Sequence, residues 1–529
     1  MRYISLVEAT GNKIGTVTAI SLPTEFQFQV GVTAQRPHVQ DFVVIEHPED
    51  NSVPMLAKII RISRFNPLLP EEATLELAQL MIEPELSPMP MMGKMEMVSA
   101  ICQVMGYLDD GKLREPGFPV RPGDSVYLPS PHFLQAILSG ATPHDDLTVG
   151  HLRNRDDVTV TVNANEILNK HLAILAMTGA GKTYTVSVVI EELMKLGYPV
   201  LIVDPHGDYT RIGVREGGGR FRYTTPGGAG GEYDITIFNK VLDPRQLGRE
   251  QFIDFVSGLS GEEISGPQRD SLRESFDKYI DQGIDRMIRE LEAERPSIHG
   301  GPATLNAIHR QLEVARLVLE DADATLLVDE IAGALGVGRG VVLNMSMVPA
   351  QAQTATVQVL LDQLFRRRKG YVVRPQTAPV FPPVFVVIEE AHNYAPSYIE
   401  EEILIPSRIT LRRIAIEGRK FGFSLCIVSQ RPSRLDSTVL SQCNSQVILR
   451  VVNPEDQHYI RQTVESLAET DLWTLPDLTQ GEALLSGSMI SIPSVVQIRL
   501  RESEESIKAV DRVREIDEYM EGERRRRAA

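Results

Sequence analysis

The stretch Ala176-Met177-Thr178-Gly179-Ala180-Gly181-Lys182-Thr183 follows an apolar run at 171–175 and precedes a helix-compatible segment at 184–196. A strand, a glycine-containing loop, a Lys-Thr pair and a helix, in that order, form the pattern of a phosphate-binding loop. The backbone N–H groups of such a loop can face a polyphosphate, and the helix N-terminus adds the positive end of its dipole. The stretch therefore predicts an α/β fold that binds a nucleoside triphosphate.

Individual roles follow from the chemistry of this loop. We expect Lys182 to reach the β- and γ-phosphates and the Thr183 hydroxyl to bind Mg²⁺, so ATP and Mg²⁺ are the expected ligands. The full set of residues expected to contact the nucleotide is Thr178, Gly179, Ala180, Gly181, Lys182, Thr183 and Tyr184. The alternative is a chance Gly-Lys-Thr at the start of a helix.

One position departs from the usual G-x-x-x-x-G-K-[ST] pattern, because Ala176 stands in place of its first glycine. Alanine tolerates a positive φ less well than glycine does. The turn into the loop must therefore avoid that region or be strained. Gly179 and Gly181, nearer the phosphates, keep the pattern.

A second candidate site follows the apolar run 383–388, which suits a buried parallel strand. The run ends in Glu389-Glu390, and the carboxyl end of such a strand is where α/β sheets place their ligands. We expect Glu389 to hold Mg²⁺ through water and Glu390 to orient or deprotonate the attacking water. A solvated acidic turn is the alternative. The spacing of 208 residues from Lys182 to Glu390 exceeds that of compact phosphate-loop enzymes and requires an insertion.

Two further residues are candidates for the reaction. The apolar strand 423–428 is followed by Ser429-Gln430, and Gln430 either senses the γ-phosphate and water or caps the strand. Arg419 is the candidate for an arginine finger, which stabilises charge on the γ-phosphoryl group. If a neighbouring subunit supplies Arg419, hydrolysis depends on ring assembly. The alternative is that Arg419 neutralises a helix dipole.

The composition narrows the class of protein. The chain has 529 residues, with 42% hydrophobic and 24% charged residues, as in ordinary globular proteins. No stretch approaches about 18 uncharged apolar residues, so we expect no membrane span. Three cysteines without metal-like spacing fit the reducing cytoplasm. A net charge of −17 argues against a surface generally coated with nucleic acid, but not against DNA in a narrow basic channel.

Strand and turn signals predict the domain organisation. Residues 1–135 contain several short strand candidates and read as a small β-barrel, with a possible short helix at 75–82. From about Thr148 the pattern becomes strand–helix alternation, which indicates a parallel sheet in a core over 136–505. Within this core we expect a helical subdomain at 243–335. The remainder, 506–529, is a charged tail that either braces a neighbour or is mobile.

Two segments inside the core have distinct signals. The glycine-rich stretch 213–231 predicts a loop or hairpin. The stretch 351–368 predicts a helix that ends in a basic run, with Gly370 as its cap.

Together these residues resemble the HerA family of the HerA–FtsK superfamily. The stretches that carry the resemblance are 177–183, Asp204-Pro205-His206-Gly207-Asp208-Tyr209, Glu389-Glu390-Ala391-His392, Glu417-Gly418-Arg419-Lys420, Ser429-Gln430-Arg431-Pro432 and 444–460. Each motif is moderately specific, whereas their order and spacing are specific together. With the β-rich first segment, the resemblance covers nearly the whole chain.

The resemblance implies a RecA-like core, a hexameric ring and a central pore for double-stranded DNA. It implies that Arg419 acts in trans on a neighbour's ATP, with Arg450 as a second candidate. It also implies a nuclease partner, typically NurA, docked near the barrel, so that the ATPase translocates DNA for end resection and repair. The segments 215–222 and 407–413, rich in arginine, are candidates for pore loops.

Other functions remain open from the residues alone. Related bacterial chains act with other effectors in phage defence, so this chain could gate a partner effector without processive motion. A conjugation or secretion ATPase is a further alternative, against which the expected barrel and the missing membrane span weigh.

Overall fold

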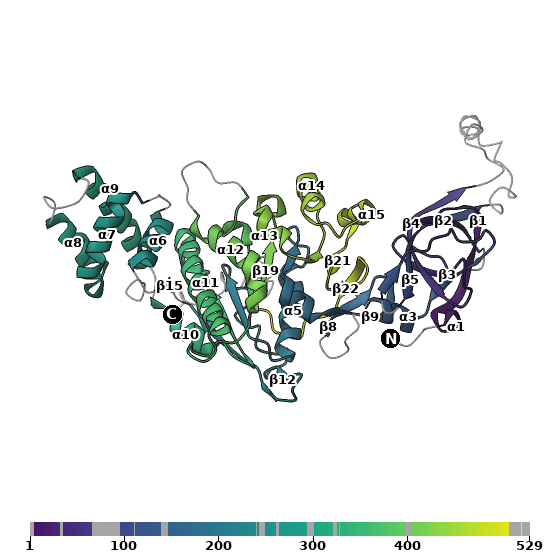
Figure 1. The fold of residues 1–529 in the computed structure, drawn as a ribbon, viewed down its shortest axis with the longest axis horizontal. Coiled ribbons are helices and arrows are strands. Elements are labelled where there is room, and N and C mark those ends of the chain that lie inside the picture. Colours follow the sequence, from purple (N-terminus) through teal and green to yellow (C-terminus); the bar gives the residue numbers. More distant parts are fainter. Residues whose placement is uncertain are drawn as a thin grey trace. The chain divides into compact units, whose positions relative to one another are not determined.

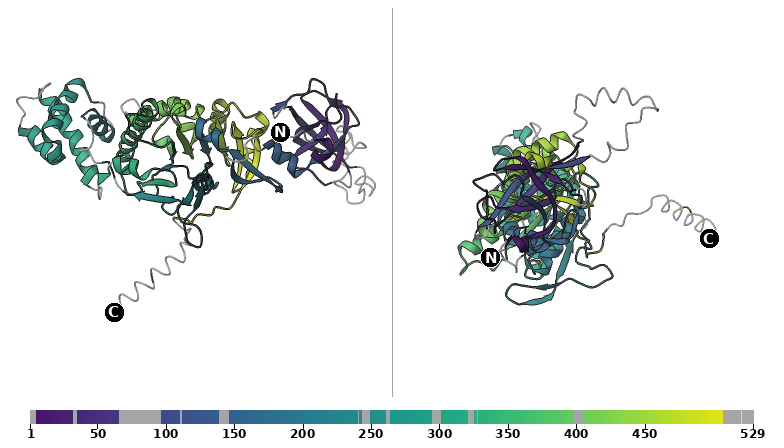
Figure 2. Two further views of the ribbon diagram at one scale, coloured as in Figure 1. Left: turned by 60° about the horizontal axis from the view of Figure 1, so that its bottom comes forward. Right: turned by 90° about the vertical axis from the view of Figure 1, so that its right-hand side faces the viewer.

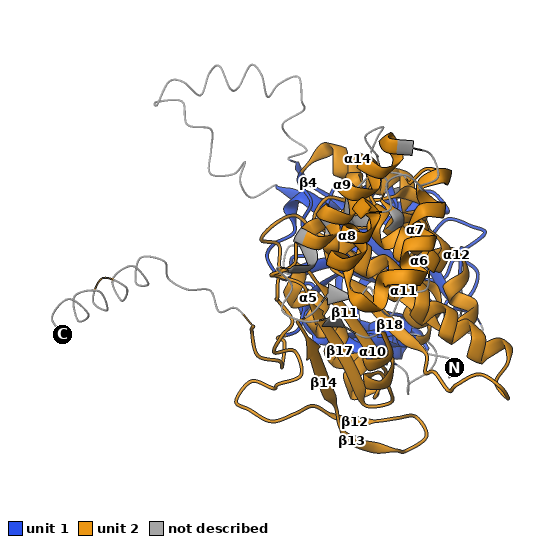
Figure 3. Cartoon of the chain, turned by 90° about the vertical axis from the view of Figure 1, so that its left-hand side faces the viewer, with its two compact units in different colours: residues 1–164, 445–452, 465–499 blue, residues 165–444, 453–464, 500–529 orange. Residues whose placement is uncertain are grey.

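The structure is a computed structural model, and it divides into two compact units, each described here by itself (Figure 3). The first unit comprises residues 1–164, 445–452 and 465–499, and the second comprises 165–444, 453–464 and 500–529. Residues described are 5–31, 35–65, 96–109, 112–138, 146–239, 241–242, 249–260, 264–293, 301–320, 325–326, 328–397, 405–506 and 520. The chain passes from the first unit to the second in α4 (Ala164–Lys170).

The first unit begins with a closed β-barrel (Figure 1). Its strands lie in the order β2-β1-β7-β3-β4-β5-β6, and pairing of β2 with β5 closes a ring of six strands, which leaves β6 on the outside. The bounds are α1 (Leu6–Ala9), β1 (Thr10–Ser21), β2 (Glu25–Val30), β3 (Phe42–Glu46), β4 (Pro54–Phe65), β5 (Met97–Asp109), β6 (Lys112–Arg114) and β7 (Ser125–Pro129).

Alternating burial explains the barrel. In β2, Phe26, Phe28 and Val30 are buried between half-buried or exposed residues, which is the period of two that a strand with one buried face requires. These side chains pack with residues such as Ile45 and Ile59 in one apolar core. The predicted small barrel is confirmed. The helix expected at 75–82 lies outside the described residues.

The first unit also holds five antiparallel strands in the order β20-β21-β22-β8-β9. Their bounds, with the helices of this unit, are α3 (Pro131–Leu138), β8 (Asp146–Leu152), β9 (Arg155–Asn163), β20 (Ser445–Ile448), α15 (Glu469–Leu472), η9 (Leu475–Asp477), β21 (Glu482–Gly487) and β22 (Ser494–Ile498). The strand–helix alternation expected from Thr148 is wrong at its start. There β8 turns directly into β9 at Asn154, whose φ of 61° is a conformation that asparagine adopts more readily than most residues.

A buried ion pair joins the barrel to the rest of the first unit. Lys58 Nζ on β4 lies 2.6 Å from Asp471 Oδ1 on α15, and both side chains are almost fully buried. The second carboxylate oxygen of Asp471 accepts the N–H of Ala468 at 3.1 Å. A buried charge is tolerated where it is paired and hydrogen-bonded, so these contacts fix the barrel strand against α15.

The second unit contains a six-stranded parallel sheet in the order β14-β17-β11-β18-β19-β10. The strands and the helices between them are β10 (Leu172–Leu175), α5 (Lys182–Lys195), β11 (Val200–Asp204), β14 (Asp234–Phe238), β17 (Arg339–Asn344), α11 (Ala350–Val373), β18 (Val384–Ile388), α12 (Pro406–Glu417) and β19 (Phe423–Ser429). All residues of β10, β11, β18 and β19 are buried, as continuous apolar strands covered on both faces require.

The direction of each crossover decides which face a helix covers. The connection through α5 runs from β10 towards β11, whereas those through α11 and α12 run the opposite way along the sheet. Right-handed crossovers therefore place α5 on one face and α11 with α12 on the other. Figure 3 shows α5 and this helix pair on either side of β11. The predicted α/β phosphate-loop core with a parallel sheet is confirmed.

The helical insertion is also confirmed (Figure 2). Its elements are β15 (Val241–Leu242), α6 (Arg249–Ser260), α7 (Gly266–Tyr279), η4 (Ile280–Gln282), α8 (Ile284–Ala293), α9 (Gly301–Glu320), β16 (Thr325–Leu326) and α10 (Val328–Ala334). The glycine-rich stretch before it forms the predicted hairpin, β12 (Arg222–Thr224) with β13 (Gly230–Glu232).

Helix α11 is longer than expected. It continues to Val373, so Gly370 lies inside the helix and the expectation that it caps the helix is wrong. The basic run instead makes contacts beyond the helix: Arg368 donates to the Phe421 carbonyl at 2.6 Å, and Lys369 pairs with Glu417 at 2.8 Å. These contacts with η7 (Gly418–Phe421) and with the last residue of α12 hold the last turns of α11.

The remaining elements follow β18 and β19: η6 (Ala391–Asn393), η8 (Pro432–Arg434), α13 (Ser437–Ser441) and α14 (Pro454–Thr463). After β22 the chain returns to the second unit at Leu500. Within the described ranges, no helix combines the length and the apolar character needed to cross a membrane. The domain boundaries expected at 135 and 505 stay a prediction.

Candidate nucleotide-binding site

The phosphate-binding loop connects β10 to α5 at the edge where the parallel strands end. Gly179 has a φ of 81° and Gly181 a φ of 96°, both in the region that favours glycine. Around Gly179 nothing lies within 4 Å of an added Cβ, so conformation rather than space requires glycine there. Gly181 is the residue before α5, and Lys182 and Thr183 begin the helix.

Ala176 sits in this loop without left-handed strain. It is absent from the described non-glycine residues with positive φ, its side chain is fully buried, and its N–H donates to the Ser429 carbonyl at 3.2 Å. The turn into the loop thus avoids the region that would require glycine. The departure from the usual pattern costs the loop no backbone strain.

Lys182 lies between the two carboxylates predicted to act with it. Its Nζ is 2.9 Å from Glu389 Oε2 and 2.5 Å from Glu390 Oε1, and all three side chains are buried. The sheet explains this contact across 208 residues of sequence, because β10 and β18 both flank β19 and end at the same edge. The structure therefore brings together the predicted lysine and both predicted acids.

Burial and charge act in opposite directions on these groups. Burial raises the pKa of Glu389 above its ordinary value, although Lys182 and the Tyr209 hydroxyl lower it. Burial also acts to lower the pKa of Lys182, but the two carboxylates outweigh it, and that pKa is raised. We conclude that Lys182 is held as a cation by Glu389 and Glu390.

Glu390 has an unusual backbone and an available oxygen. Its φ of 49° and ψ of 46° are left-handed, a conformation that costs a residue with a side chain roughly 1–2 kcal/mol. Its Oε2 atom is buried and makes no hydrogen bond within the described part of the chain. His392 Nδ1 lies 3.4 Å from that oxygen and 3.2 Å from Ser429 Oγ. This buried oxygen makes no hydrogen bond and has only the His392 ring beside it, so it is suited to accept a proton from water.

Gln430 connects the loop to the acidic strand end. Its Nε2 donates to Glu390 Oε1 at 2.5 Å, and its Oε1 accepts from the Thr178 hydroxyl at 2.6 Å. The amide of Gln430 thus joins a residue expected to contact the nucleotide to the residue expected to act on water, and its role as a sensor stays a prediction.

A third segment enters the site from the end of β11. The carboxylate of Asp204 accepts the N–H groups of His206, Gly207, Asp208 and Tyr209 at 2.8–3.2 Å, which folds this segment into a tight loop. The loop brings the Tyr209 hydroxyl onto Glu389 Oε1 and Asp208 Oδ2 to 3.5 Å from Thr183 Oγ1.

Asp208 and Tyr209 were not among the predicted site residues. The signal that could have identified them was present, since the segment 204–209 follows a buried strand that ends at the same edge. The directions of the Asp208 and Tyr209 side chains cannot be predicted from the sequence, because they depend on the four hydrogen bonds that the Asp204 carboxylate accepts from the loop.

The donor set suits Mg²⁺. Thr183 and Asp208 present oxygen ligands, the type that hard divalent cations prefer. Among the described residues there is no cluster of three or more histidine, cysteine, aspartate or glutamate side chains that could hold a metal. Mg²⁺ keeps several waters and phosphate oxygens as ligands, so a sparse protein contribution fits it better than a closed cage.

Two predicted residues lie apart from the acidic strand end. The Tyr184 hydroxyl accepts the N–H of Arg501 at 2.6 Å, so it points towards the segment after β22. Arg419 is exposed in η7, before the first residue of β19. Because the loop lies where the parallel strands end and β19 spans seven residues, about 20 Å of strand separates Arg419 from its own chain's site. Arg450 belongs to the first unit, where its Nε donates to the Pro476 carbonyl at 3.1 Å.

The candidate pore segments carry arginines that are already paired. Arg215 lies 3.2 Å from Glu502, and Arg220 lies 3.1 Å from Asp234. Arg408 and Arg412 both contact the buried Asp436, at 2.8 and 3.3 Å. Their role as pore loops stays a prediction.

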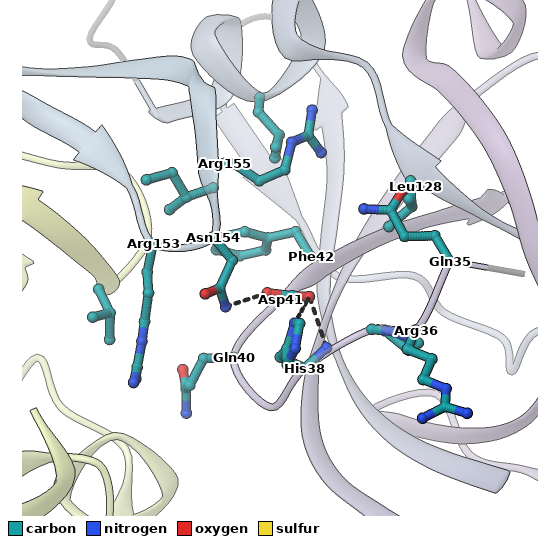
Figure 4. A pocket seen from close by; sticks show the side chains of 14 residues that line it. Gln35, Arg36, His38, Gln40, Asp41, Phe42, Leu128, Arg153, Asn154 and Arg155 are labelled. Carbon is teal, nitrogen blue, oxygen red and sulfur yellow. Dashed lines mark hydrogen bonds and ion pairs between the residues drawn. The ribbon is translucent and has the colours of Figure 1, made fainter.

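A separate pocket lies within the first unit (Figure 4). Its lining includes Arg36, Asp41, Arg153 and Asn154, and Asp41 accepts from Asn154 Nδ2 at 3.3 Å. Arg153 is paired with Glu482 at 2.9 Å. None of the residues that line this pocket belongs to the phosphate-binding loop or the acidic strand end, so it is no part of the nucleotide site.

The sequence comparisons agree with this geometry. Residues 147–364 match the family model described as "Helicase HerA, central domain". A protein of Sulfurisphaera tokodaii named DNA double-strand break repair helicase HerA is 31% identical over 395 residues, which cover 74% of this chain and 75% of that protein. This chain belongs to the HerA family. The HerA helicase of Pyrococcus furiosus is 28% identical over 77% of this chain and 78% of its own length.

Solved structures overlap the fold at much lower identity. VirB4 of Thermoanaerobacter pseudethanolicus is 15% identical, covers 68% of this chain and 98% of its own, and has a TM-score of 0.48. The family assignment rests on the HerA sequences.

Proposed function

We propose that this HerA-family chain is an ATP-driven double-stranded DNA translocase, or helicase, that works with a nuclease in end resection and repair. One observation carries the proposal: Lys182 of the phosphate-binding loop lies 2.9 and 2.5 Å from two carboxylates, one of which has a buried oxygen that makes no hydrogen bond within the described residues. The relatives named as double-strand break repair helicases support the coupling to DNA.

Nucleotide binding is assigned to the loop and its neighbours. The backbone of residues 178–183 and the Lys182 ammonium bind the phosphates of ATP, with Tyr184 as a further contact. Thr183 and Glu389 hold Mg²⁺, and the position of Asp208 adds a third oxygen donor. When bound, Mg²⁺ neutralises charge on the phosphate oxygens. Lys182 exchanges its carboxylate partners for phosphate, which frees Glu390.

Hydrolysis then uses the residues of the strand ends. Glu390 accepts the proton of the attacking water at Oε2, and Gln430 orients that water and the γ-phosphate while it holds Thr178. The buried positions of Lys182 and Glu390 strengthen their interactions with nearby charges.

Arg419 is assigned to a neighbouring subunit's site. It lies at the opposite edge of the sheet from its own loop, so it cannot complete that loop's site within one chain. In a homo-hexameric ring, a subunit can present this edge to the next subunit's nucleotide. The ring places DNA in its centre, and a NurA-like nuclease docks near the barrel. The expected location in the cytoplasm and the expected role of the tail at 506–529 as a brace stay predictions.

The test is the steady-state ATPase activity of the full chain, with and without linear duplex DNA, together with its mass in solution. A hexameric mass and stimulation by duplex DNA are the expected results. A hexamer whose ATPase activity does not change on addition of duplex DNA would instead favour the alternative, an ATPase that gates a partner effector in defence. A chain that hydrolyses no ATP under either condition would contradict the proposal.

A further inference from the structure

The loop after Gln430 carries two exposed arginines beside the nucleotide site. Arg431 follows Gln430 directly, and Arg434 ends the single turn of η8. Both side chains are exposed, and neither guanidinium forms an ion pair or a hydrogen bond within the described part of the chain. The three arginines of the neighbouring helix α12 are different, since Arg408 and Arg412 are paired with Asp436 and Arg413 with Asp362.

The backbone of this loop is rigidly held. The N–H of Arg431 donates to Ser429 Oγ at 3.0 Å, the oxygen that also lies 3.2 Å from the His392 ring. The carbonyl of Arg434 accepts from Ser397 at 2.8 Å, and the N–H of Ser433 donates to the buried Asp456 at 3.0 Å. These bonds therefore fix the backbone at Arg431 and Arg434 beside Gln430.

The positive charges of Arg431 and Arg434 act on His392. Burial lowers the pKa of His392, and the positive charges of Lys182, Arg431 and Arg434 lower it further, whereas Glu390 raises it. His392 contacts Glu390, so groups that act on its ring are near the acidic strand end. The three acids Asp208, Glu389 and Glu390 outnumber the one lysine of the loop, Lys182.

We propose that Arg431, assisted by Arg434, binds the terminal phosphate of ATP held by the same chain. It thereby distinguishes triphosphate from diphosphate in cis, before a neighbour's Arg419 completes the site. The inference rests on the proposed ATPase function and adds to it the residue that recognises the γ-phosphate by charge. Guanidinium suits this role because it can bind two phosphate oxygens at once.

The test compares two ligands rather than activity alone. Affinities of the full-length protein for ADP and for a non-hydrolysable ATP analogue are measured by calorimetry with Mg²⁺ at fixed salt. Arg431→Ala is expected to weaken binding of the analogue by about 10- to 100-fold, the range of a hydrogen bond to a charged group. Binding of ADP is expected to change less than about twofold, because no γ-phosphate is present. Arg431→Lys is expected to recover part of the loss.

Controls separate this inference from its competitors. Arg289→Ala removes an exposed arginine of α8 and is expected to leave both affinities unchanged. Equal losses for both ligands, or none, would overturn the inference. So would a variant that keeps the preference for the analogue but loses duplex DNA affinity with a smaller salt dependence, which would assign Arg431 to the DNA backbone. If the unaltered protein binds neither nucleotide, the proposed function itself is wrong.

Discussion

Glu390 has a strained, left-handed backbone directly after the end of β18. The left-handed conformation turns its side chain back to Lys182 and Gln430, and the N–H of Asn393 donates to its carbonyl at 2.8 Å, which starts η6. Strain of this kind persists only where surrounding contacts hold it. The short 3₁₀ turn and the two side-chain partners are those contacts, so the carboxylate is oriented before any substrate binds.

Ala176 allows a direct test of the loop geometry. Because its backbone avoids positive φ, Ala176→Gly is expected to leave ATP affinity within about twofold and to lower the free energy of unfolding by about 0.5–1 kcal/mol through the greater freedom of glycine in the unfolded chain. Nucleotide titration and urea unfolding measure the two quantities. A large gain in affinity on substitution would show that alanine distorts the loop.

His171 predicts a pH dependence of stability. Its Nδ1 accepts from the Leu425 N–H at 2.9 Å and its Nε2 donates to the Ala415 carbonyl at 3.0 Å, a neutral ring held by two bonds. Burial lowers its pKa from 6.5 to about 4. Between these pKa values His171 is protonated in the unfolded chain but neutral in the folded chain. The contribution of the neutral ring to the free energy of unfolding is therefore fully present above pH 6.5 and is lost as the pH falls towards 4.

The measurement is urea unfolding at two pH values. Between pH 7 and pH 5 this group should remove about 2 kcal/mol from the free energy of unfolding. His171→Asn is the matched control, because asparagine tolerates the φ of 60° and can still accept the Leu425 N–H but does not titrate. If the variant and the unaltered chain lose the same amount of stability, the buried neutral histidine is not the cause.

At the residue scale, the sequence predicts the site residues that lie at the ends of the parallel strands. It does not predict the site residues that the loop after β11 positions. Lys182, Glu389, Glu390 and Gln430 each follow an apolar strand, and parallel strands end at a common edge. Tyr209 depends on the turn around Asp204, which no periodic pattern records. The predicted roles of these residues and of Arg419 stay predictions.

At the scale of elements, helix α5 is bound on its far side by the segment that follows β22. Glu191, fully buried in α5, accepts at Oε1 from the N–H groups of Glu502 and Ser503 and from the Ser503 hydroxyl, at 2.7–2.9 Å. Lys195 on the same helix lies 2.5 Å from Glu502. The helix that begins at Lys182 is thus joined to residues 500–506 along one face.

Glu191→Ala is expected to release this segment. Each hydrogen bond to a buried carboxylate contributes about 1.5–3 kcal/mol, so loss of the three at Glu191 should accelerate amide exchange of residues 500–506 by at least about 10- to 100-fold while that of the sheet stays unchanged. Hydrogen exchange by mass spectrometry measures both. Glu455→Ala, an exposed acid on α14, is the control. Unchanged exchange in the Glu191 variant would show that other contacts hold the segment.

The elements differ in how far their sequence predicts them. Buried parallel strands and the barrel strands have strong apolar patterns, so they were found. The prediction of strand–helix alternation from Thr148 is wrong at β8 and β9, because a strand that pairs with the next strand and a strand that leads into a helix have the same local apolar pattern. The end of α11 near Gly370 contacts η7 and the last residue of α12 through Arg368 and Lys369, and these partners are distant in sequence.

At the scale of the whole molecule, the assignment of Arg419 to a neighbouring subunit predicts that mixing two inactive variants restores ATPase activity. Glu390→Gln subunits lack the base but present Arg419, whereas Arg419→Ala subunits have the base but present no arginine. Each alone should lose ATPase activity by about 100-fold or more. Random mixing into one ring should make about one quarter of the sites complete.

The steady-state ATPase of mixed and unmixed rings is the measurement. The mass of each assembly in solution is the control, since a variant that fails to assemble would lose activity for another reason. Mixing Glu390→Gln with Glu390→Gln,Arg419→Ala subunits should restore nothing. Arg419→Ala rings that keep full activity alone would refute the assignment in trans.

The first unit combines strands within residues 10–163 with strands within residues 445–498, so it can be completed only late in synthesis of the chain. Strand β8 pairs with β22, whose last residue is Ile498, so it awaits a partner made more than three hundred residues later. Ribosomes add about 5–20 residues per second, which leaves that strand edge open for tens of seconds. An unpaired edge can join another chain. The unit that contains the N-terminus is therefore among the last to be completed as the chain emerges from the ribosome.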